Sequence, residues 1–289
     1  MMSAQIEDFK KAIHDIIEDL YSLDCIASEI IDFTQANQQE VWRRLCLEIS
    51  HTGFNVSQES HKFNVTPHYF DENMLLFYKK SDGFIYETMV ESRNPYRMKK
   101  WLNIVEFMLE NSEYKPHEKK VLLYGDSVGS DSIFLNKLGF EVYYHDFESY
   151  CSSFANYRFK KRGLSINKYS REDKNFDFVI CLEVAEHVPD PLDLVRELSS
   201  LTSLNGCCIF SEAFNLVLDN FPTHLATNIQ YAGKVDELFR SVGMNVLWKD
   251  VDNKPIVYAK YANSISRYPR ESSIHRVKKI INKVIRRGA

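Results

Sequence analysis

A short glycine-containing segment and a carboxylate some twenty residues later could together hold a nucleoside. The segment Gly125–Gly129 directly follows an apolar run and opens a helical pattern, and Asp146 ends the next apolar run. A loop with little side-chain bulk lets the backbone approach a ligand closely, and an acid at the second strand end accepts hydrogen bonds from both ribose hydroxyls. An ordinary tight turn and a solvated strand end are the alternative interpretations.

Two histidines follow later apolar runs and could act as general bases. His187 comes just after the run at 176–183, and His224 follows the run at 205–214. Imidazole titrates near neutral pH, so it can remove the proton of a hydroxyl nucleophile. Structural roles remain open for both, because His187 could hydrogen-bond a framing loop and His224 could cap a helix that contains Asn228 and Tyr231.

From residue 118 onward, strand and helix patterns alternate. Apolar runs predict strands at 119–125, 140–146, 176–183, 205–214, 244–251 and 255–262. Helical patterns lie between them at 130–139, 150–163, 190–202 and 234–243. Such alternation predicts an α/β fold, in which helices cover both faces of a parallel sheet and strand ends carry the site residues.

Residues 1–115 read as mostly helical. Apolar residues from Ile13 to Tyr21 recur every three or four positions, and 98–111 forms a second amphipathic pattern in which Trp101 and Phe107 are expected in the core. The polar stretch 51–73 carries turn residues, so we expect irregular structure there, folded on the body through its apolar residues Phe63, Val65, Tyr69 and Phe70.

The run from Phe176 to Pro191 resembles the fourth strand and following helix of the class I S-adenosylmethionine (SAM)-dependent methyltransferases. The matching positions are Phe176, Asp177, Glu183, Glu186, His187, Val188, Asp190 and Pro191, followed by Asn205 and Gly206. VLLYGDSVGS resembles the first motif of that family, and VYYHDFES, with Asp146 and Phe147, resembles the second. The resemblance covers about residues 120–250, a little under half of the chain.

This resemblance implies a Rossmann-like, doubly wound, seven-stranded and mostly parallel sheet with SAM as cofactor. The implied cofactor-binding residues are Gly125, Asp126, Ser127, Gly129, Asp146, Phe147 and Glu183. The implied substrate-binding residues are Tyr96 and Arg97, in a segment that closes over such sites, and Tyr231. The expected domains are a helical N-terminal lobe or lid at 1–115, a SAM-binding domain at 116–262 and a basic tail at 263–289.

The sequence departs from the family at two positions. Leu123 stands where the family has an acid in the first strand, and Ser127 replaces the middle glycine; Asp126 could partly substitute for the missing acid. A SAM-fold binding or scaffold protein without catalysis is therefore the alternative function. Glu183, Glu186 and His187 also resemble the E-x-x-E-H cluster of ubiquinone-biosynthesis O-methyltransferases, which can bind a divalent cation, but we expect no metal because many relatives share the motif without one.

With His187 and His224 as the catalytic residues, we expect methyl transfer to a hydroxyl, rather than an amine, of a small polar or glycan-type acceptor, as in surface-glycan synthesis.

Charge is unevenly distributed along the chain. Residues 267–289 contain eight lysines and arginines against one acid, a net +7, so the rest carries −11 of the total −4. An acidic body disfavours a nucleic-acid partner.

The tail contains a basic amphipathic helix at 274–289, suited to a membrane surface, to an acidic partner or to docking on the acidic body. The six cysteines form no CxxC pair, and the chain shows neither a signal-peptide core nor a long apolar run. These features predict reduced thiols and a cytoplasmic protein, peripheral at the inner membrane face through its tail. No pattern indicates an oligomeric state.

Overall fold

The computed structural model describes residues 2–249 and 255–260. The predicted basic tail at 263–289, including the amphipathic helix at 274–289, lies outside the described residues.

The centre of the molecule is the predicted seven-stranded, mostly parallel sheet, with strand order β3-β2-β1-β4-β5-β7-β6. The strands are β1 (Lys120–Tyr124), β2 (Glu141–His145), β3 (Asn167–Lys168), β4 (Phe176–Leu182), β5 (Thr202–Ser211), β6 (Asn245–Lys249) and β7 (Ile256–Ala259). The first five pair in parallel, and β7 lies antiparallel between β5 and β6. The order reverses direction at β1, so loops after β1 and β4 diverge at the carboxyl edge and leave room for a ligand there.

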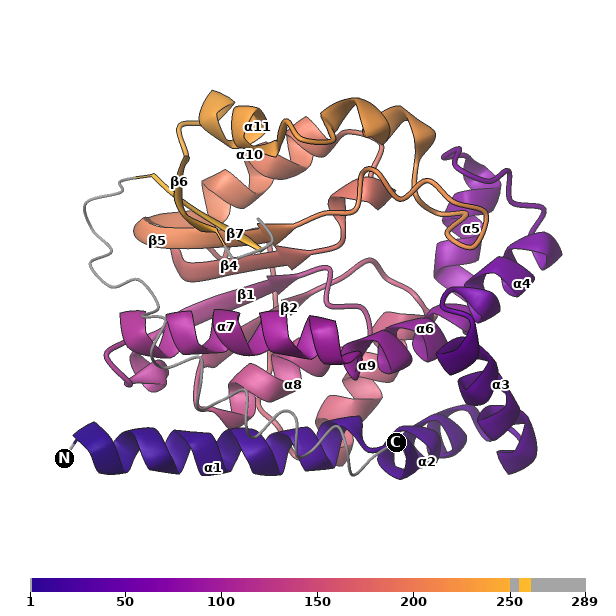
Figure 1. Cartoon of the computed structure of the whole chain (residues 1–289), viewed down its shortest axis with the longest axis horizontal. Helices are drawn as coiled ribbons and strands as arrows, with labels where there is room; N and C mark the ends of the chain where they lie inside the picture. Colours follow the sequence, from indigo (N-terminus) through magenta and orange to yellow (C-terminus); the bar gives the residue numbers. More distant parts are fainter. Residues whose placement is uncertain (1, 250–254, 261–289) are drawn as a thin grey trace.

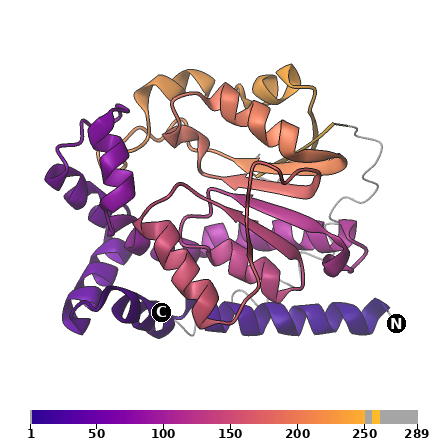
Figure 2. The ribbon, with the colours of Figure 1, turned by 180° about the vertical axis from the view of Figure 1, so that it is seen from behind.

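Helices cover both faces of this sheet, as Figures 1 and 2 show from opposite sides. On one side lie α1 (Met2–Tyr21), α7 (Pro95–Asn111), α8 (Ser130–Lys137) and α9 (Tyr150–Lys161). On the other lie α10 (Pro191–Leu201) and α11 (Val235–Ser241). Short 3-10 helices occupy Pro116–Glu118 (η1), Ala185–His187 (η2) and Ala226–Tyr231 (η3). None of the described helices is both long and apolar enough to cross a bilayer.

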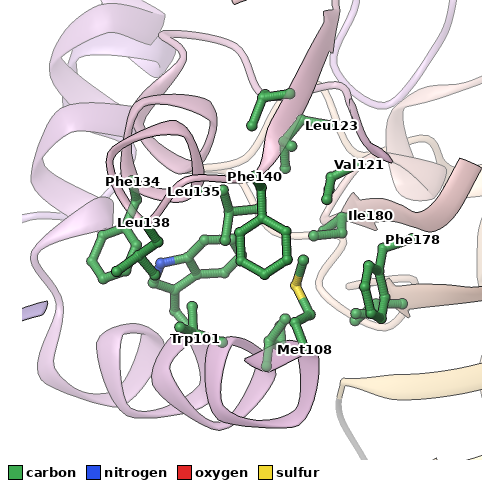
Figure 3. Packing of buried hydrophobic residues seen from close by; sticks show 14 of the residues in the cluster. Trp101, Met108, Val121, Leu123, Phe134, Leu135, Leu138, Phe140, Phe178 and Ile180 are labelled. Atoms are coloured by element: carbon green, nitrogen blue, oxygen red, sulfur yellow. The ribbon is translucent and has the colours of Figure 1, made fainter. Parts of the chain in front are cut away.

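The larger hydrophobic cluster lies between the sheet and α7, α8 and α1. Figure 3 shows Trp101 and Met108 of α7 packed against Phe134 of α8 and against Val121 and Ile180 of the sheet. Trp101 is 1% exposed and Phe107 is fully buried, which confirms both as core residues. Helix α7 therefore packs on the sheet and α1 packs on α8 in the same cluster, although both lie within the predicted lobe at 1–115; the division into three domains stays a prediction.

The remaining N-terminal helices form a separate group beside the carboxyl ends of the strands (Figure 1). They are α2 (Leu23–Thr34), α3 (Gln38–Ser50), α4 (Phe54–Lys62), α5 (Glu72–Lys80) and α6 (Gly83–Ser92). A third cluster joins α2, α3 and α6 to Phe154 of α9. This group, which we call the lobe helices, therefore covers the edge of the sheet where strand-end residues gather.

The expectation of irregular structure throughout 51–73 is wrong for Phe54–Lys62, which forms α4. A residue of α3 stabilises the start of this helix, because the Glu48 carboxylate accepts hydrogen bonds from the amides of Gly53 (2.5 Å) and Asn55 (3.0 Å). A capping group so far upstream gives no local pattern. Beyond α4, Phe63, Val65 and Phe70 pack inward as expected, whereas Tyr69 is 60% exposed.

All six cysteines are free thiols. Cys207 and Cys208 are neighbours on β5 and are both fully buried. Because successive side chains of a strand point to opposite faces, Cys207 belongs to the α7 side of the sheet and Cys208 to the α10 side. Burial raises the pKa of both thiols.

Candidate functional site

The loop between β1 and α8 is the predicted glycine loop. Gly125 and Gly129 have φ angles of 80° and 75°, in the left-handed region that favours glycine. A Cβ at Gly125 would lie 2.4 Å from a methyl group of Val184, and one at Gly129 would lie 2.5 Å from the Phe159 ring. Both glycines are therefore required by close packing as well as by backbone conformation.

Asp146, at the end of β2, holds this loop. Its carboxylate accepts a hydrogen bond from the Ser127 amide at 2.5 Å, and the Tyr144 hydroxyl donates to the Ser127 carbonyl at 2.6 Å. Burial raises the pKa of Asp146 to about 6, although hydrogen bonds from the Ser127 and Phe147 amides oppose the shift. The structure thus brings the glycine loop and the proposed ribose acid together.

Phe147, the next residue, lines a cavity of about 560 Å³ and is 44% exposed. The cavity lies between the end of α5 and the start of α9, and its other lining residues are Lys79, Lys80, Glu148, Ser149, Tyr150 and Ser153. Its size and its exposed ring beside Asp146 fit a nucleobase. The residues around this loop thus fit an adenosine-type cofactor.

Asp126 holds the start of α8, and its predicted part in cofactor binding stays a prediction. Its carboxylate caps α8 by accepting hydrogen bonds from the amides of Asp131 (3.2 Å) and Ser132 (2.7 Å). Burial and the charge of Asp131 raise the pKa of Asp126 to about 7. Leu123, which stands in place of the family's acid, is 2% exposed and packs in the sheet core. Both oxygens of Asp126 are therefore already engaged within the loop.

Of the residues expected to bind substrate, Arg97 pairs with a carboxylate of its own chain, because its guanidinium donates to Asp131 at 2.8 Å. Tyr96, beside it, is 53% exposed, with the Lys100 ammonium 4.2 Å from its ring centre. Tyr231 packs against Phe214, with ring centres 5.8 Å apart. Substrate binding by Tyr96, Arg97 and Tyr231 stays a prediction.

His187 and His224, from two separate loops, are brought together. Their rings pack edge to face with centres 4.8 Å apart. The Nδ1 atom of His187 lies 3.1 Å from the Tyr78 hydroxyl and 3.2 Å from the Thr223 carbonyl oxygen. Donation from Nδ1 to that carbonyl would leave the other ring nitrogen free to accept a proton.

Both imidazoles are neutral at pH 7. Burial and the neighbouring His224 lower the pKa of His187 to about 3. Burial lowers the pKa of His224 to about 4, with a smaller opposing effect from the Leu216 backbone. Beside them, Glu186 is 1% exposed, and burial together with the Glu183 charge raises its pKa well above the usual range.

Three atoms in this group lack a hydrogen-bond partner among the described residues: both carboxylate oxygens of Glu186 and Nδ1 of His224. Ligand atoms of Glu186, His187 and His224 lie within 4.8 Å of one another. One carboxylate and two imidazoles are a donor set that a divalent ion such as Zn²⁺ can use. Glu183, which the sequence placed in a cation cluster, is exposed and outside this group; its cofactor-binding role stays a prediction.

Sequence reasoning did not identify the residue that joins the two histidine loops. Asn228 is 1% exposed, and its side-chain amide lies 2.9–3.2 Å from the carbonyl oxygens of Ala185, Glu186 and Val188. The Leu225 amide adds a hydrogen bond to the Glu186 carbonyl at 2.9 Å. His224 does not cap this 3-10 helix; the capping position is Leu225 and has no side-chain hydrogen bond.

Two lobe residues also reach the site. Tyr78 of α5 contacts His187, as described above, and the Thr88 hydroxyl of α6 lies 3.3 Å from that of Ser127. Both contacts join residues far apart in the sequence, so no local motif indicated them. The lobe helices therefore touch both the histidine pair and the glycine loop.

Comparisons with known proteins identify a family of similar sequences. The sequence profile of a methyltransferase domain matches residues 92–274, nearly two thirds of the chain. A ubiquinone biosynthesis O-methyltransferase from Colwellia psychrerythraea is 30% identical over 128 residues, covering 41% of this chain and 52% of that protein. The chain thus spans about half the length of this curated relative.

Two of the solved structures that the chain matches are methyltransferases. A SAM-dependent methyltransferase from Aquifex aeolicus has 21% identity and a TM-score of 0.43, over 58% of this chain and 94% of that one. The magnesium protoporphyrin IX methyltransferase of Synechocystis, solved with bound SAM, has 17% identity and a TM-score of 0.43, over 58% and 82%. On the profile match, the chain belongs to the methyltransferase-domain family, whose class I members use S-adenosylmethionine as cofactor.

Proposed function

We propose that this methyltransferase transfers the methyl group to a hydroxyl of a small polar or glycan-type acceptor. The observation that carries the proposal is the neutral histidine pair at the carboxyl edge of the sheet, next to the loop that fits the cofactor. Bound SAM supplies an electrophilic methyl group on a sulfonium. A hydroxyl becomes a competent nucleophile only when its proton is removed, which is the task of a neutral imidazole.

Different residues of the chain would accept the proton and position the base. Nδ1 of His224 has no partner among the described residues, so it is available to take the acceptor proton. Tyr78 and Thr223 hold His187 beside it. Burial at this edge keeps both imidazoles in the uncharged form that a general base needs, although the same burial lowers their basicity.

Replacing either histidine tests this assignment. His224→Ala and His187→Ala should each lower kcat by about 10²- to 10⁴-fold, the usual contribution of a general base, because the acceptor keeps its proton. SAM affinity, measured by calorimetric titration, should stay unchanged because neither ring contacts the glycine loop. If both variants turn over at the wild-type rate, neither histidine is the base.

A SAM-fold binding or scaffold protein without catalysis is the second candidate. It is favoured by Leu123, whose side chain is buried in the core where the family has an acid, and by Ser127 in place of a glycine. Titration with SAM and with its demethylated product, S-adenosylhomocysteine, addresses this alternative. Binding of both ligands without methylation of any acceptor would favour the scaffold, and binding of neither would exclude the enzyme.

A further inference from the structure

Helix α6 has two opposite faces with different surroundings. Ile85, Tyr86 and Met89 pack in the cluster shared by the lobe helices and α9. The opposite face, spaced by three and four residues, carries Phe84, Glu87, Thr88 and Glu91. A buried helix rarely places two carboxylates on a side that meets other protein, so this second face requires an explanation.

Contacts at both ends show that this second face points at the site. The Phe84 ring stacks on Tyr78, with centres 5.2 Å apart, and the Tyr78 hydroxyl contacts His187. One turn further on, the Thr88 hydroxyl contacts Ser127 of the glycine loop. Glu87 precedes Thr88 on this face, and its charge acts on Tyr78, which contacts His187.

The carboxylates here are poorly compensated. Glu87 has no hydrogen-bond or ion-pair partner in the part of the chain that the structure describes, and it is only half-buried. Burial and the charges of Glu48 and Glu91 raise the pKa of Glu87 to about 8. Burial also raises the pKa of Glu91; this is opposed by Arg97, which is itself paired with Asp131, and by a hydrogen bond from the Asn94 side chain at 3.3 Å.

A second observation at the sheet edge points to a ligand. Glu186 is 1% exposed and neither of its oxygens has a partner in the described ranges, although a buried carboxyl normally has one. Glu183, three residues earlier on the same loop, lies near enough to both Glu186 and Glu91 for their charges to interact. Carboxyl groups from α6 and from the loop after β4 thus lie near one another, since Glu87 and Glu186 both act on Tyr78, and the buried oxygens of Glu186 are unpaired in the described ranges.

We propose that the acceptor carries an ammonium group close to the hydroxyl that is methylated, and that Glu87 and Glu91 bind this group. The acceptor class is then an amino alcohol, an amino sugar being the glycan-type example. An ammonium offers three donors to these carboxyl groups and stabilises their ionised form, whereas a phosphate or carboxylate on the acceptor would oppose their ionisation. The inference rests on the proposed transfer to a hydroxyl.

The reaction can be followed without knowing the acceptor. The full chain is incubated with trideuteromethyl-SAM and a protein-free small-molecule extract of cells that make the protein. Mass spectrometry then identifies products that have gained one trideuteromethyl group, and passage over a cation exchanger at neutral pH separates them by charge. We expect the labelled product in the retained fraction.

Two variants and a control connect that product to α6. Glu87→Gln should lower kcat/KM for the purified product's precursor by about 10- to 100-fold, the range for losing one partner of a charged pair. Glu91→Gln provides the same test if Glu87→Gln does not fold. The control is Glu172→Gln, on an exposed loop, which should keep the wild-type rate.

Three outcomes would overturn the inference. A labelled product only in the unretained fraction would leave the proposed methyl transfer intact but exclude the ammonium. Wild-type turnover by both α6 variants would show that their carboxylates do not bind the acceptor. A loss of S-adenosylhomocysteine affinity in Glu87→Gln equal to its loss of turnover would assign the carboxylate to the cofactor. By contrast, no labelled product in either fraction would overturn the proposed function itself.

Discussion

Ionisable side chains around the site are mostly uncharged at neutral pH. His187 and His224 have pKa values of about 3 and about 4, whereas burial raises that of Glu87 to about 8 and that of Glu186 well above its usual range. The common cause is burial, which disfavours the charged form of acids and bases alike. The site therefore contains both proton acceptors and proton donors, and a charged ligand would change which groups are ionised.

Glu87 should make stability depend on pH. Its pKa is about 8 in the folded chain against an ordinary value of 4.5, so the folded state binds more protons between these pH values. Its contribution to stability is fully present below pH 4.5 and is lost as the pH rises through 8. Glu87→Gln should therefore melt increasingly above the wild type as the pH rises across this window, in scanning calorimetry.

The exposed variant Glu172→Gln is the control for that series and should show no such trend. A constant difference between Glu87→Gln and the wild type at all pH values would contradict the raised pKa. A rise in melting temperature together with a loss of turnover would show that the carboxylate is kept for function at the expense of stability.

Among single residues, the site residues that belong to local sequence motifs could be predicted from the sequence. Gly125, Gly129 and Asp146 follow consecutive strands at fixed spacing, so their meeting follows from the parallel sheet. Tyr78 and Glu87 could not be predicted, because their approach to His187 and the glycine loop depends on how the lobe helices pack. The contact of His187 with His224 likewise depends on Asn228, whose side-chain amide joins the loop after β4 to η3; we call this connection the Asn228 clamp.

Among the elements, strands and helices after residue 118 were predictable because their apolar patterns are continuous. Helix α4 was not, since it buries only Val56 as an apolar residue beside the polar Asn55 and Ser60. The short β3 had no explicit prediction either, because its two residues, Asn167 and Lys168, are both exposed. Weak amphipathicity of the sequence, rather than unusual structure, explains why neither α4 nor β3 was predicted.

The loop after β4 and the 3-10 helix η3 should act as one element because Asn228 joins them. Asn228→Ala removes donors to three backbone carbonyls, so we expect a loss of about 1–3 kcal/mol in unfolding free energy. Because His187 and His224 would lose their fixed separation, kcat should fall while SAM affinity is unchanged. Denaturant unfolding and steady-state kinetics measure the two effects.

Gln230→Ala, at an exposed position of the same 3-10 helix, should change neither quantity. If Asn228→Ala lowered stability but kept the wild-type kcat, the clamp would be structural only, and the separation of the histidines would not limit the reaction.

For the whole molecule, one buried arginine connects the lobe helices to the cofactor loop. Arg158 of α9 is fully buried, donates to Glu29 of α2 at 2.9 Å, and also donates to the Val128 carbonyl at 2.7 Å and the Ser130 hydroxyl at 2.8 Å. Arg162 also donates to Glu29. The position of α2 is therefore linked to the geometry of the glycine loop by a single side chain.

Glu29→Gln should destabilise the chain by about 3–5 kcal/mol, because it leaves the Arg158 charge buried without compensation. S-adenosylhomocysteine binding should weaken as well, since Arg158 also holds the loop. Asp32→Asn, which breaks the exposed pair with Lys161 on the same two helices, should leave both properties nearly unchanged. Equal effects of the two variants would contradict a specific link through Arg158.

The two adjacent thiols of β5 can report the opening of the two helical layers that cover the sheet. Cys207 and Cys208 face opposite helical layers and are both inaccessible, whereas Cys46 is exposed. An alkylating reagent should modify Cys46 at once, and should reach Cys207 only when α7 lifts away and Cys208 only when α10 does. The order in which Cys207 and Cys208 are modified, read by fragmenting the peptide that contains both, would thus reveal which side of the sheet opens first. No engineered cysteine is needed.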